Sequence, residues 1–503
     1  MGTRKIPFNL TSREIGKFNT MQNLLGQYKL KDGCFDEVFE QKGTYRPEYK
    51  LLESIANNMD VSTFYSLNEE AKLSFFNQGI TYALYTAQES TETIFQFDLM
   101  PRVVSAEEWD VLERGLIQRN TALNMFIHDV YNDAKILKDK VVPADLIYSS
   151  KHFVHEMKGF SPVGNIYCHI AGTDLIRHSD GNYYILEDNL RSPSGVSYVL
   201  SNRVTLTRTL PNLFQGKRIH PVSQYPKELL ETLRSVSNQQ EDDVVCVLLT
   251  PGQYNSAYYE HSFLAKMMGI ELVEGPDLFV ENDKVYMNTI GKKVKVDVIY
   301  RRIDDAFLDP EVFRKDSMLG VKGLMNAYLK GNVTIVNAPG TGISDDKAVC
   351  VFVPDMIKYY LSEEPIISNV PTYICEKPAD LAYVLENISS MVIKPVDMSG
   401  GYGVTIMEEL TKEETEEVKE KIKANPREYI AQPKMMLSCH ATYIEDLRQF
   451  EPRHIDLRTF ALMGKDRSYI LPGGLTRVAL KRDSLIVNSS QGGGSKDTWV
   501  MMN

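Results

Sequence analysis

Short apolar runs alternate with helical periodicity through the middle of the chain. Three β-branched runs, at 244–252, 296–303 and 333–340, each end in turn residues. Between them, apolar residues recur at helical spacing over 258–268 and 321–329. Strands that are apolar along their whole length and alternate with helices indicate an α/β region around a buried parallel sheet.

Helical spacing dominates the N-terminal part of the chain. Apolar residues recur at helical intervals over 46–86, and again over 105–140 behind a capping box formed by Ser105 and Glu108. A second strand-rich region begins at 391 and continues to 493. It contains one helix, at 411–424, whose Glu/Lys run is typical of a solvated face.

The patterns predict an α/β (α+β) protein with five consecutive parts. They are a flexible lead-in at 1–30, a mainly helical N-terminal region at 31–145, a part with a polar hairpin at 146–240, an α/β domain at 241–345 and a second strand-rich part at 346–503. A chain of 503 residues is long enough for two or three domains with ordinary hydrophobic cores.

Composition limits the class of protein but does not identify its activity. Hydrophobic residues make up 43% of the chain and charged residues 24%, which is typical of a globular protein. The longest apolar runs are too short to span a bilayer, and the N-terminus has no signal-peptide core, so we expect a cytoplasmic protein without a membrane partner. A net charge of -11 disfavours nucleic acid as a partner, while the oligomeric state stays open.

Cysteine chemistry is not the expected function. The six cysteines are scattered, no CxxC pair occurs, and no histidine stands at zinc-ligand spacing from them. Cys439 and His440 are adjacent, but adjacency alone makes neither a zinc site nor a thiol-imidazole pair. Reduced, mostly buried thiols are the expectation.

The segment 171–195 predicts a β-hairpin. Asp180-Gly181 lies between two β-prone runs, and a type I′ turn needs positive φ at both of its central residues. Pairing of Ser179 with Asn182 would then place Ile176 opposite Ile185.

The same register places Asp174 directly opposite Glu187. Asn189 shares the face of Glu187, whereas Leu175, Leu186 and Asp188 point the other way. Two facing carboxylates repel, and the arrangement makes sense if a cation sits over that face. Three oxygen-bearing side chains suit Mg²⁺; a hairpin with a simply wet polar face is the alternative.

Several segments offer groups for an anion. Arg191, in the loop that follows the hairpin, stands among hydroxyls. Lys394 ends an apolar strand and precedes a loop without bulky side chains, whose backbone N–H groups can approach phosphates: Ser399, Gly400, Gly401 and Gly403. Neither the P-loop nor the Rossmann pattern is present. Lys347 follows a small-residue loop where a helix opens, and a capped helix start with a surface lysine is an equal alternative.

The C-terminal part adds a backbone edge and two strand arginines. Gln432 ends a strand of the kind that hydrogen-bonds an adenine edge, although many unrelated connections look the same. Arg458 shares a strand face with Asp456, and Arg477 follows a Gly-Gly turn. Arginines in such positions pair with carboxylates, either structurally or around an anion. The segment 488–499 is too polar for a core strand, and either an oxyanion-type loop or a surface loop is expected.

The chain resembles the circularly permuted ATP-grasp proteins (type 2) related to the synthetase domain of glutathionylspermidine synthase. The resemblance rests on FDLMPRVVSAEEW (97–109), LEDNLRSPSGVSY (186–198), LTPGQYNSAYYEH (249–261), DDKAV (345–349), VIKPVDMSGGYG (392–403), LPGGLTRVAL (471–480) and NSSQGGGSKDTWV (488–500). It covers nearly everything after residue 30, and it explains why the carboxylates precede the lysine and glycine-rich loop.

The resemblance implies roles for most candidate residues. Mg²⁺ would bind Asp174, Glu187 and Asn189, ATP phosphates would bind Lys347 and Lys394 beneath the 400–403 loop, and adenine would lie near Gln432. One departure is that the relatives carry an arginine where this chain has Gly172, and the nearby Arg177 or Arg191 are the expected substitutes.

The implied activity is Mg-ATP-dependent ligation of a carboxylate to an amine through an acyl phosphate, with release of ADP. Arg191, Arg458 and Arg477 would hold the carboxylate and the developing oxyanion. The substrates, of amino-acid, peptide or polyamine type, are not fixed by these motifs. A small-molecule kinase and a non-catalytic nucleotide-binding protein are the alternatives.

Overall fold

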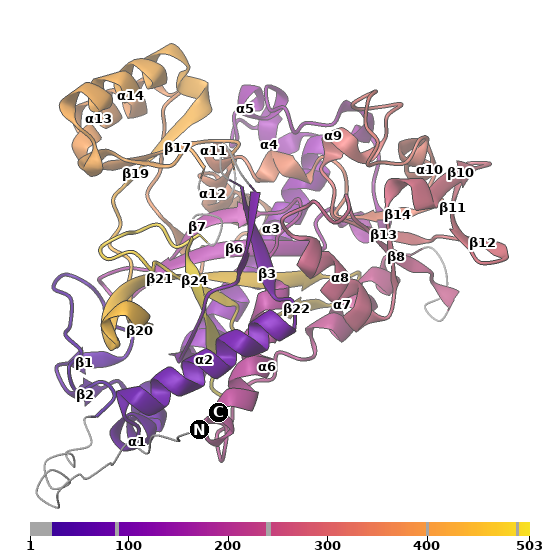
Figure 1. The fold of residues 1–503 in the computed structure, drawn as a ribbon. Coiled ribbons are helices and arrows are strands. Elements are labelled where there is room, and N and C mark those ends of the chain that lie inside the picture. The colour runs from indigo at the N-terminus through magenta and orange to yellow at the C-terminus, as the bar shows by residue number, and fades with distance from the viewer. Residues whose placement is uncertain (1–22, 86–89, 238–242, 399–401, 489–491) are drawn as a thin grey trace, which may run out of the picture.

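A mixed sheet of nine strands forms the centre of the molecule (Figure 1). The computed structural model describes residues 23–85, 90–237, 243–398, 402–488 and 492–503. Seven strands follow one another across the sheet in the order β15 (Ser368–Asn369), β7 (Tyr183–Asn189), β6 (Ile170–Arg177), β21 (Gln449–Met463), β23 (Leu475–Val478), β24 (Gly494–Val500) and β5 (Phe97–Val104), while β20 (Cys439–Ile444) and β22 (Ser468–Ile470) also pair with β21. Segments from both ends of the chain therefore build a single sheet.

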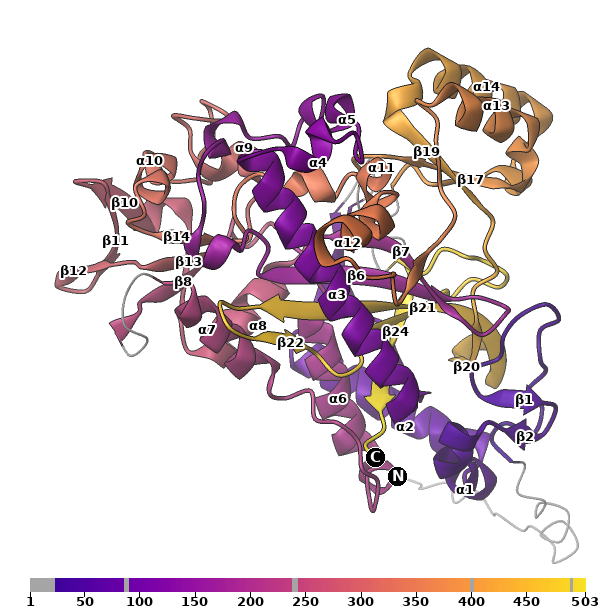
Figure 2. The same cartoon turned by 180° about the vertical axis from the view of Figure 1, so that it is seen from behind.

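Helices cover both faces of this sheet, and the alternation along β21 shows it. Leu457 and Ala461 face the core beneath α3 (Ala106–Tyr131), which crosses the sheet in Figure 2. Phe460 and Leu462 face the opposite core, which α6 (Val196–Thr209) and α7 (Tyr225–Ser235) cover. The period-2 pattern of the strand thus feeds two separate hydrophobic cores.

The helix predicted over 105–140 is present as α3, followed by the short α4 (Lys135–Lys138) and α5 (Ala144–Tyr148). Ser105 caps α3 by accepting a hydrogen bond from the Glu108 backbone N–H. The carboxylate of Glu108 pairs with Arg177, and only the serine half of the expected capping box is recorded at this helix start. The N-cap is therefore a single hydrogen bond.

The N-terminal region is less helical than its periodicity predicts. Helices α1 (Lys50–Asn58) and α2 (Val61–Asn77) occupy the helical stretch, but the chain also forms β1 (Phe39–Gln41), β2 (Thr44–Tyr45) and the hairpin of β3 (Thr81–Tyr85) and β4 (Ser90–Ile94). Residues 1–22 of the expected lead-in lie outside the described residues. Leu24, Leu25 and Tyr28, which follow, are buried in a core, so this part is packed rather than loose.

The three apolar runs in the middle of the chain form a parallel sheet, as predicted. Its strands follow the order β14 (Thr334–Val336), β13 (Val298–Arg301), β8 (Cys246–Leu249) and β9 (Glu271–Val273), and every neighbouring pair is parallel. The predicted helices are α8 (Tyr258–Met268) and α10 (Leu324–Leu329), with the short α9 (Asp305–Leu308) between them in sequence. A separate antiparallel sheet extends from this domain, formed by β10 (Leu278–Glu281), β11 (Lys284–Thr289) and β12 (Lys292–Lys295).

A small lobe stands over one edge of the central sheet (orange in Figure 1). It consists of β16 (Tyr373–Ile374), β17 (Met391–Pro395), β18 (Thr405–Ile406), β19 (Tyr429–Pro433), α13 (Pro378–Glu386) and α14 (Lys412–Ala424). The predicted charged helix is α14, which Thr411 and Glu414 cap reciprocally. Only Ile422 of α14 is buried, in the core of the lobe, as a solvated helix predicts. The helices α11 (Lys347–Cys350) and α12 (Val353–Leu361) connect the lobe to the rest.

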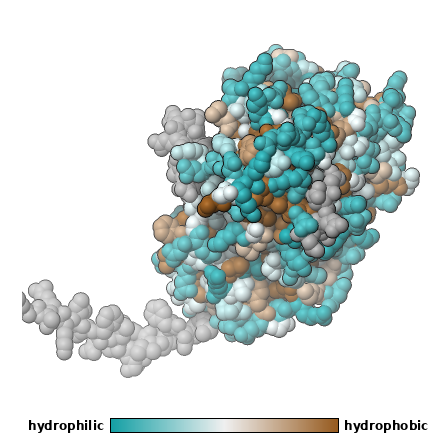
Figure 3. All heavy atoms as spheres, turned by 90° about the vertical axis from the view of Figure 1, so that its right-hand side faces the viewer, coloured by the Kyte–Doolittle hydropathy of each residue, from teal (hydrophilic) through white to brown (hydrophobic). Residues whose placement is uncertain are grey.

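The distribution of polar and apolar residues on the surface is that of the globular protein which the composition predicts. Figure 3 shows one side of the molecule, where hydrophilic residues predominate and hydrophobic ones form scattered patches. Within the described part of the chain, none of the helices combines the length and the apolar character that crossing a bilayer requires.

The segment 488–499 contradicts the expectation of a loop. From Gly494 onward it is β24, a fully buried strand between β23 and β5. Its polar side chains are all provided with partners: Lys496 Nζ lies 2.6 Å from Asp98, Asp497 lies 2.6 Å from Arg203, and Thr498 bonds to Thr476 at 2.8 Å. Polar residues can therefore form a core strand here because distant segments supply their hydrogen bonds and charges.

Replacing Lys496 with Met tests this buried pairing. We expect the free energy of unfolding to fall by about 3–5 kcal/mol, because Asp98 would stay buried without its cation. The double variant Lys496→Met with Asp98→Asn should recover part of the loss. Lys423→Met, which breaks an exposed pair with Glu420 on α14, should change stability by less than about 1 kcal/mol. Urea unfolding followed by circular dichroism measures all three; a Lys496→Met protein as stable as the wild type would contradict the pairing.

Candidate active site

The hairpin of β6 and β7 brings Asp174 opposite Glu187, as the sequence predicts. Its turn is not the expected two-residue type. His178 pairs with Asn182 through a 2.9 Å backbone hydrogen bond, and Gly181 has a φ of +83° while Asp180 does not take a positive φ. A three-residue loop with glycine in the left-handed position therefore replaces the type I′ turn.

A β-bulge restores the register beyond this turn. Leu175 pairs with Ile185, and Ile176 pairs with Tyr184, not with Ile185 as predicted. Leu186 is the extra residue of the bulge, so the pairing shifts by one and Asp174 again meets Glu187. The bulge also turns Leu186 into the same cavity as Ile176, although simple alternation predicts that it points away.

The opposite face of β7 carries a structural ion pair. Asp188 accepts hydrogen bonds at 2.8 and 2.6 Å from the Arg119 guanidinium on α3, and it contacts the Cys350 thiol. Asp188 therefore points away from Asp174, as alternation predicts. Its pairing with Arg119 fixes the position of α3 against the sheet.

Two arginines from neighbouring strands hold Asp174. Arg458 stands directly opposite it on β21 and donates from Nε and Nη2 at 2.6 and 2.8 Å. Arg477, on the next strand β23, donates to Asp174 at 2.8 Å and also to Asp456. The predicted sharing of one face by Asp456 and Arg458 is present, and the two carboxylates and two guanidinium groups form one cluster, in which Arg458 is half-buried and the other three residues are buried.

Arg458 and Arg477 offset much of the repulsion between the Asp174 and Glu187 carboxylates, which led us to expect a cation. Burial alone would raise the pKa of Asp174, but the charges of Arg458 and Arg477 outweigh burial and hold that pKa well below its ordinary value. Asp174 is therefore ionised at neutral pH. Within the described residues, the positive charge that faces Asp174 comes from the guanidinium groups of Arg458 and Arg477.

Glu187 faces the lysines. Lys347 Nζ lies 3.5 Å from Glu187 Oε2, and its ammonium also donates to the Met398 carbonyl ahead of the glycine-rich loop. Lys394 is buried at the end of β17, where burial lowers its pKa to about 8, the Glu187 charge opposes that change and Lys347 adds to it. Two lysines thus stand beside one carboxylate, an arrangement that favours the arrival of further negative charge.

These side chains line one cavity that is both charged and apolar. Its charged lining residues are Asp174, Glu187, Lys347, Lys394, Asp456 and Arg477. Its apolar lining residues are Ile176, Leu186, Val392, Val404, Ile406, Met435, Leu437, Ile486 and Val487. A ligand that combines an apolar body with an anionic group matches this lining.

Of the candidate residues that the structure describes, Asp174, Glu187, Lys347, Lys394, Gln432 and Arg477 line this cavity, whereas Asn189, Arg191, Gly403 and Arg458 are not among its lining residues. Gln432 lies on its wall, with its side-chain amide bonded to Thr372 at 2.9 Å. Gly403 has a φ of +73°, and a Cβ there would come within 2.8 Å of Pro395, so glycine is required. Ser399, Gly400 and Gly401 lie outside the described residues.

The structure separates Arg191 from this group. Its guanidinium bonds to Asp345 and Asp304, each at 2.7 Å, below the loop that precedes α11. Arg177, the other expected substitute at the Gly172 departure, pairs with Glu37 at 3.2 Å and stacks on an N-terminal aromatic ring. Arg458 and Arg477 are the arginines beside Asp174.

Sequence reasoning missed one segment of the cavity lining. Leu485, Ile486 and Val487 line the cavity, and they belong to a short apolar run after β23. That run could have been noticed in the sequence, because three apolar residues between charged and glycine-rich stretches are expected to pack against another part of the protein.

The oxygen donors fit Mg²⁺ to different degrees. Glu187 presents a carboxylate to the cavity. Asn189, opposite Gly172, is not among the lining residues, and its N–H₂ donates to the Gly172 carbonyl at 3.4 Å. Asp174 already accepts three guanidinium N–H bonds. About four acceptor positions exist on a carboxylate, so one remains for a cation. Glu187 is therefore the main carboxylate available to an ion in the cavity.

Comparison with known proteins gives the class that this fold and cavity define. The family described as circularly permuted ATP-grasp type 2 matches residues 101–479. The chain belongs to this family, and its mixed helix and sheet architecture confirms the predicted α/β fold.

Relatives extend over nearly the whole chain. An uncharacterized protein of Synechocystis sp. is 48% identical over 93% of this chain and 97% of its own length. A putative glutamate–cysteine ligase of Frankia alni is 38% identical over 93% of this chain, which spans only 54% of that protein. A glutathione synthetase-like effector from Globodera pallida, solved in its apo form, has a TM-score of 0.56 at 13% identity, covering 88% of this chain and 98% of the effector; it shares the fold.

The lowered pKa of Lys394 predicts a pH-dependent stability. The folded chain releases this proton near pH 8 and the unfolded chain near its ordinary value of 10.5, so the unfolded state binds more protons between these values. The cost of burying the charged amine is therefore full below pH 8 and falls as pH rises to 10.5.

Lys394→Met removes that cost. At pH 7 we expect the variant to gain up to about 3 kcal/mol in free energy of unfolding over the wild type, and this gain should shrink steadily toward pH 10. Urea unfolding of both proteins at a series of pH values measures the difference, with Lys423→Met as the exposed control. A difference that does not change with pH would contradict the assignment.

Proposed function

We propose that the chain is an ADP-forming ligase that joins a carboxylate to an amine with Mg-ATP. The observation that carries the proposal is one cavity lined by lysines and carboxylates together with a large set of apolar side chains. ATP has the matching shape, because its base is flat and its triphosphate is anionic. Membership in the ATP-grasp family supports the same nucleotide.

The charged lining residues would receive the triphosphate. Lys347 and Lys394 would neutralise the phosphate oxygens, and binding of an anion would raise the pKa of Lys394 back toward its ordinary value. The glycine-rich loop at 399–403 would cover the phosphates, and the base would lie beside Gln432 among the apolar lining residues, which would form an apolar slot. Glu187 and Asn189, with the remaining acceptor position of Asp174, would hold Mg²⁺, which would supply charge stabilisation during phosphoryl transfer.

The two strand arginines would act close to the reacting groups. Arg458 reaches Asp174 and lies 3.9 Å from Glu187, so it spans both carboxylates of the hairpin. We propose that Arg458 and Arg477 keep Asp174 in place and stabilise negative charge that develops as the substrate carboxylate attacks the γ-phosphate. The acyl phosphate would then be attacked by an amine, with loss of phosphate.

Arg191 remains in the proposal as a second anion-binding group. Its side chain is 19% exposed although it is held by Asp304 and Asp345. A substrate carboxylate could compete with these carboxylates for the guanidinium, which would place the acid substrate beside the loop before α11.

The relatives favour amino acids or short peptides as substrates. The Frankia protein carries the name of a glutamate–cysteine ligase, but this chain corresponds to about half of it, so either half can account for that name. The fold neighbour is glutathione synthetase-like. The narrower relation to glutathionylspermidine synthase adds polyamines to the amines worth testing.

Glu187→Gln tests the catalytic assignment. We expect ADP release from Mg-ATP to fall at least about 100-fold, because the variant loses charge that binds the metal ion and balances both lysines. Glu420→Gln, on the exposed face of α14, is the matched control and should keep full activity. Circular dichroism checks that both variants are folded. Undiminished turnover by a folded Glu187→Gln protein would overturn the assignment.

Product analysis distinguishes ligation from phosphorylation. The assay measures ADP and phosphate with Mg-ATP against a panel of amino acids, short peptides and polyamines. Ligation predicts that an acid and an amine are needed together, that phosphate equals ADP, and that hydroxylamine traps the acyl phosphate as a hydroxamate. A stable phosphorylated product formed from one hydroxyl compound would instead establish a kinase.

A further inference from the structure

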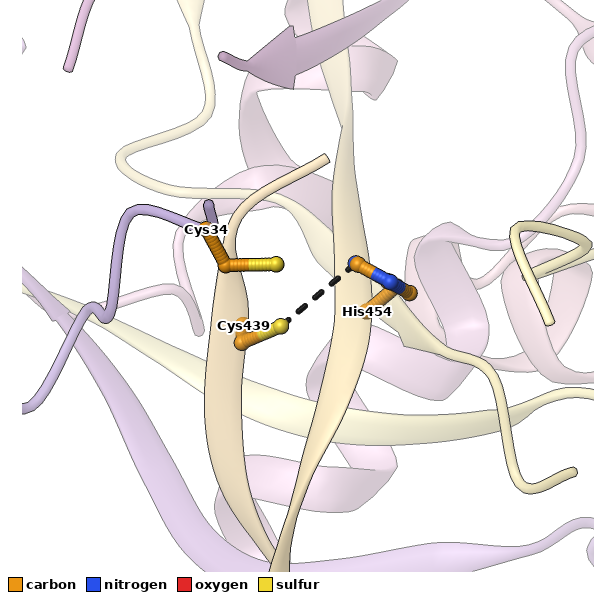
Figure 4. A group of neighbouring side chains, drawn as sticks. All are labelled: Cys34, Cys439 and His454. Atoms are coloured by element: carbon orange, nitrogen blue, oxygen red, sulfur yellow. Dashed lines mark hydrogen bonds between the residues drawn. The ribbon is translucent and has the colours of Figure 1, made fainter. Parts of the chain in front are cut away.

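Two cysteines and a histidine from three different segments lie close together (Figure 4). Cys439 on β20 stands directly opposite His454 on β21, and their side chains are 3.5 Å apart. Cys34 arrives from the N-terminal segment, where the Phe35 carbonyl accepts a 2.8 Å hydrogen bond from the Cys439 backbone. One ligand atom from each of the three residues lies within 4.8 Å of the other two.

The chemistry of this cluster is that of a metal site. Two thiols and an imidazole are the donors that Zn²⁺ and similar ions prefer. Burial, aided by the nearby Lys31 charge, lowers the pKa of His454 to about 4, so the ring is neutral at pH 7 and has a lone pair to offer. Cys439 is fully buried and Cys34 is partly exposed, which gives an ion a route from solvent.

The ammonium group of Lys31 is hydrogen-bonded to the His454 ring. His454 Nδ1 lies 2.9 Å from the Leu437 carbonyl, which can only accept, so Nδ1 carries the proton and Nε2 the lone pair. Lys31 Nζ donates to Nε2 at 3.0 Å and also reaches Asp483 at 2.7 Å. A metal ion bound through Nε2 must displace Lys31. An ion bound through Nδ1 would shift the ring proton to Nε2, and the N–H group there would repel the Lys31 ammonium.

We propose that Cys34, Cys439 and His454 bind a thiophilic divalent cation such as Zn²⁺, in competition with the Lys31 ammonium. Both thiols would lose their protons on binding, and water or the Asp483 carboxylate would complete four-coordination. The proposal is independent of the ligase activity.

The ion would join the N-terminal segment to the sheet that bears the active site. Leu437, whose carbonyl orients His454, lines the nucleotide cavity, and Asp456 stands two residues after His454 on the same strand. Phe35, next to Cys34, packs against the turn of the carboxylate hairpin at Gly181. Bound metal would therefore make one unit of the N-terminal segment, β20 and the hairpin.

Cobalt(II) titration of the reduced full-length protein tests the site. We expect one equivalent to bind with thiolate-to-cobalt charge-transfer absorption, and Zn²⁺ to displace it. Cys439→Ser should weaken binding at least about 100-fold, whereas Lys31→Met should tighten it at least about 10-fold because the competing cation is removed. Cys246→Ser, a buried cysteine on β8, is the matched control and should bind as the wild type does.

Two results would overturn the proposal. One is the absence of charge-transfer absorption in the folded wild type and in Lys31→Met. The other is binding that Cys34→Ser and Cys439→Ser leave unchanged, since the ion would then sit elsewhere. Circular dichroism of each variant confirms that a loss of binding is not a loss of fold.

Discussion

Asp174 is the point at which three strands of the central sheet are held in a common arrangement. Its carboxylate on β6 accepts from Arg458 on β21 and Arg477 on β23, and Asp456 completes the cluster. Removing one partner would leave buried charge without compensation, which is far more costly than losing an exposed pair. The same strands carry part of the wall of the cavity, and β6 pairs with β7, on which Glu187 faces Lys347.

The sequence could predict features whose cause is local. Apolar periodicity identified α3, α8 and the parallel sheet, and a Glu/Lys run indicated the solvated helix α14. The pairing of Asp174 with Glu187 was also predicted, but through two deviations that cancel: the turn is one residue longer than expected, and the bulge at Leu186 compensates. A bulge depends on how the strand packs, so alternation alone could not anticipate it.

Features that depend on distant partners were not predictable in this way. Arg458 and Arg477 lie 284 and 303 residues from Asp174 in the chain, and only the strand order shows that they meet. The polar strand β24 is stable in the core because Asp98 and Arg203 neutralise it, which composition cannot show. Arg191 was expected to hold an anion, and its pairing with Asp304 and Asp345, more than 100 residues away in the chain, could not be read from the sequence. The family assignment is confirmed, while the metal and substrate roles of single residues stay predictions.

The central claim is that one cavity holds the nucleotide and its metal ion together. Diffraction from crystals grown with Mn²⁺ and a non-hydrolysable ATP analogue tests it most directly, because Mn²⁺ gives an anomalous signal where Mg²⁺ would bind. The account predicts a metal peak about 2.1 Å from a Glu187 oxygen, phosphates against Lys347 and Lys394, and the base in the apolar slot by Gln432. A nucleotide bound outside this cavity, or a metal peak away from Glu187, would contradict it.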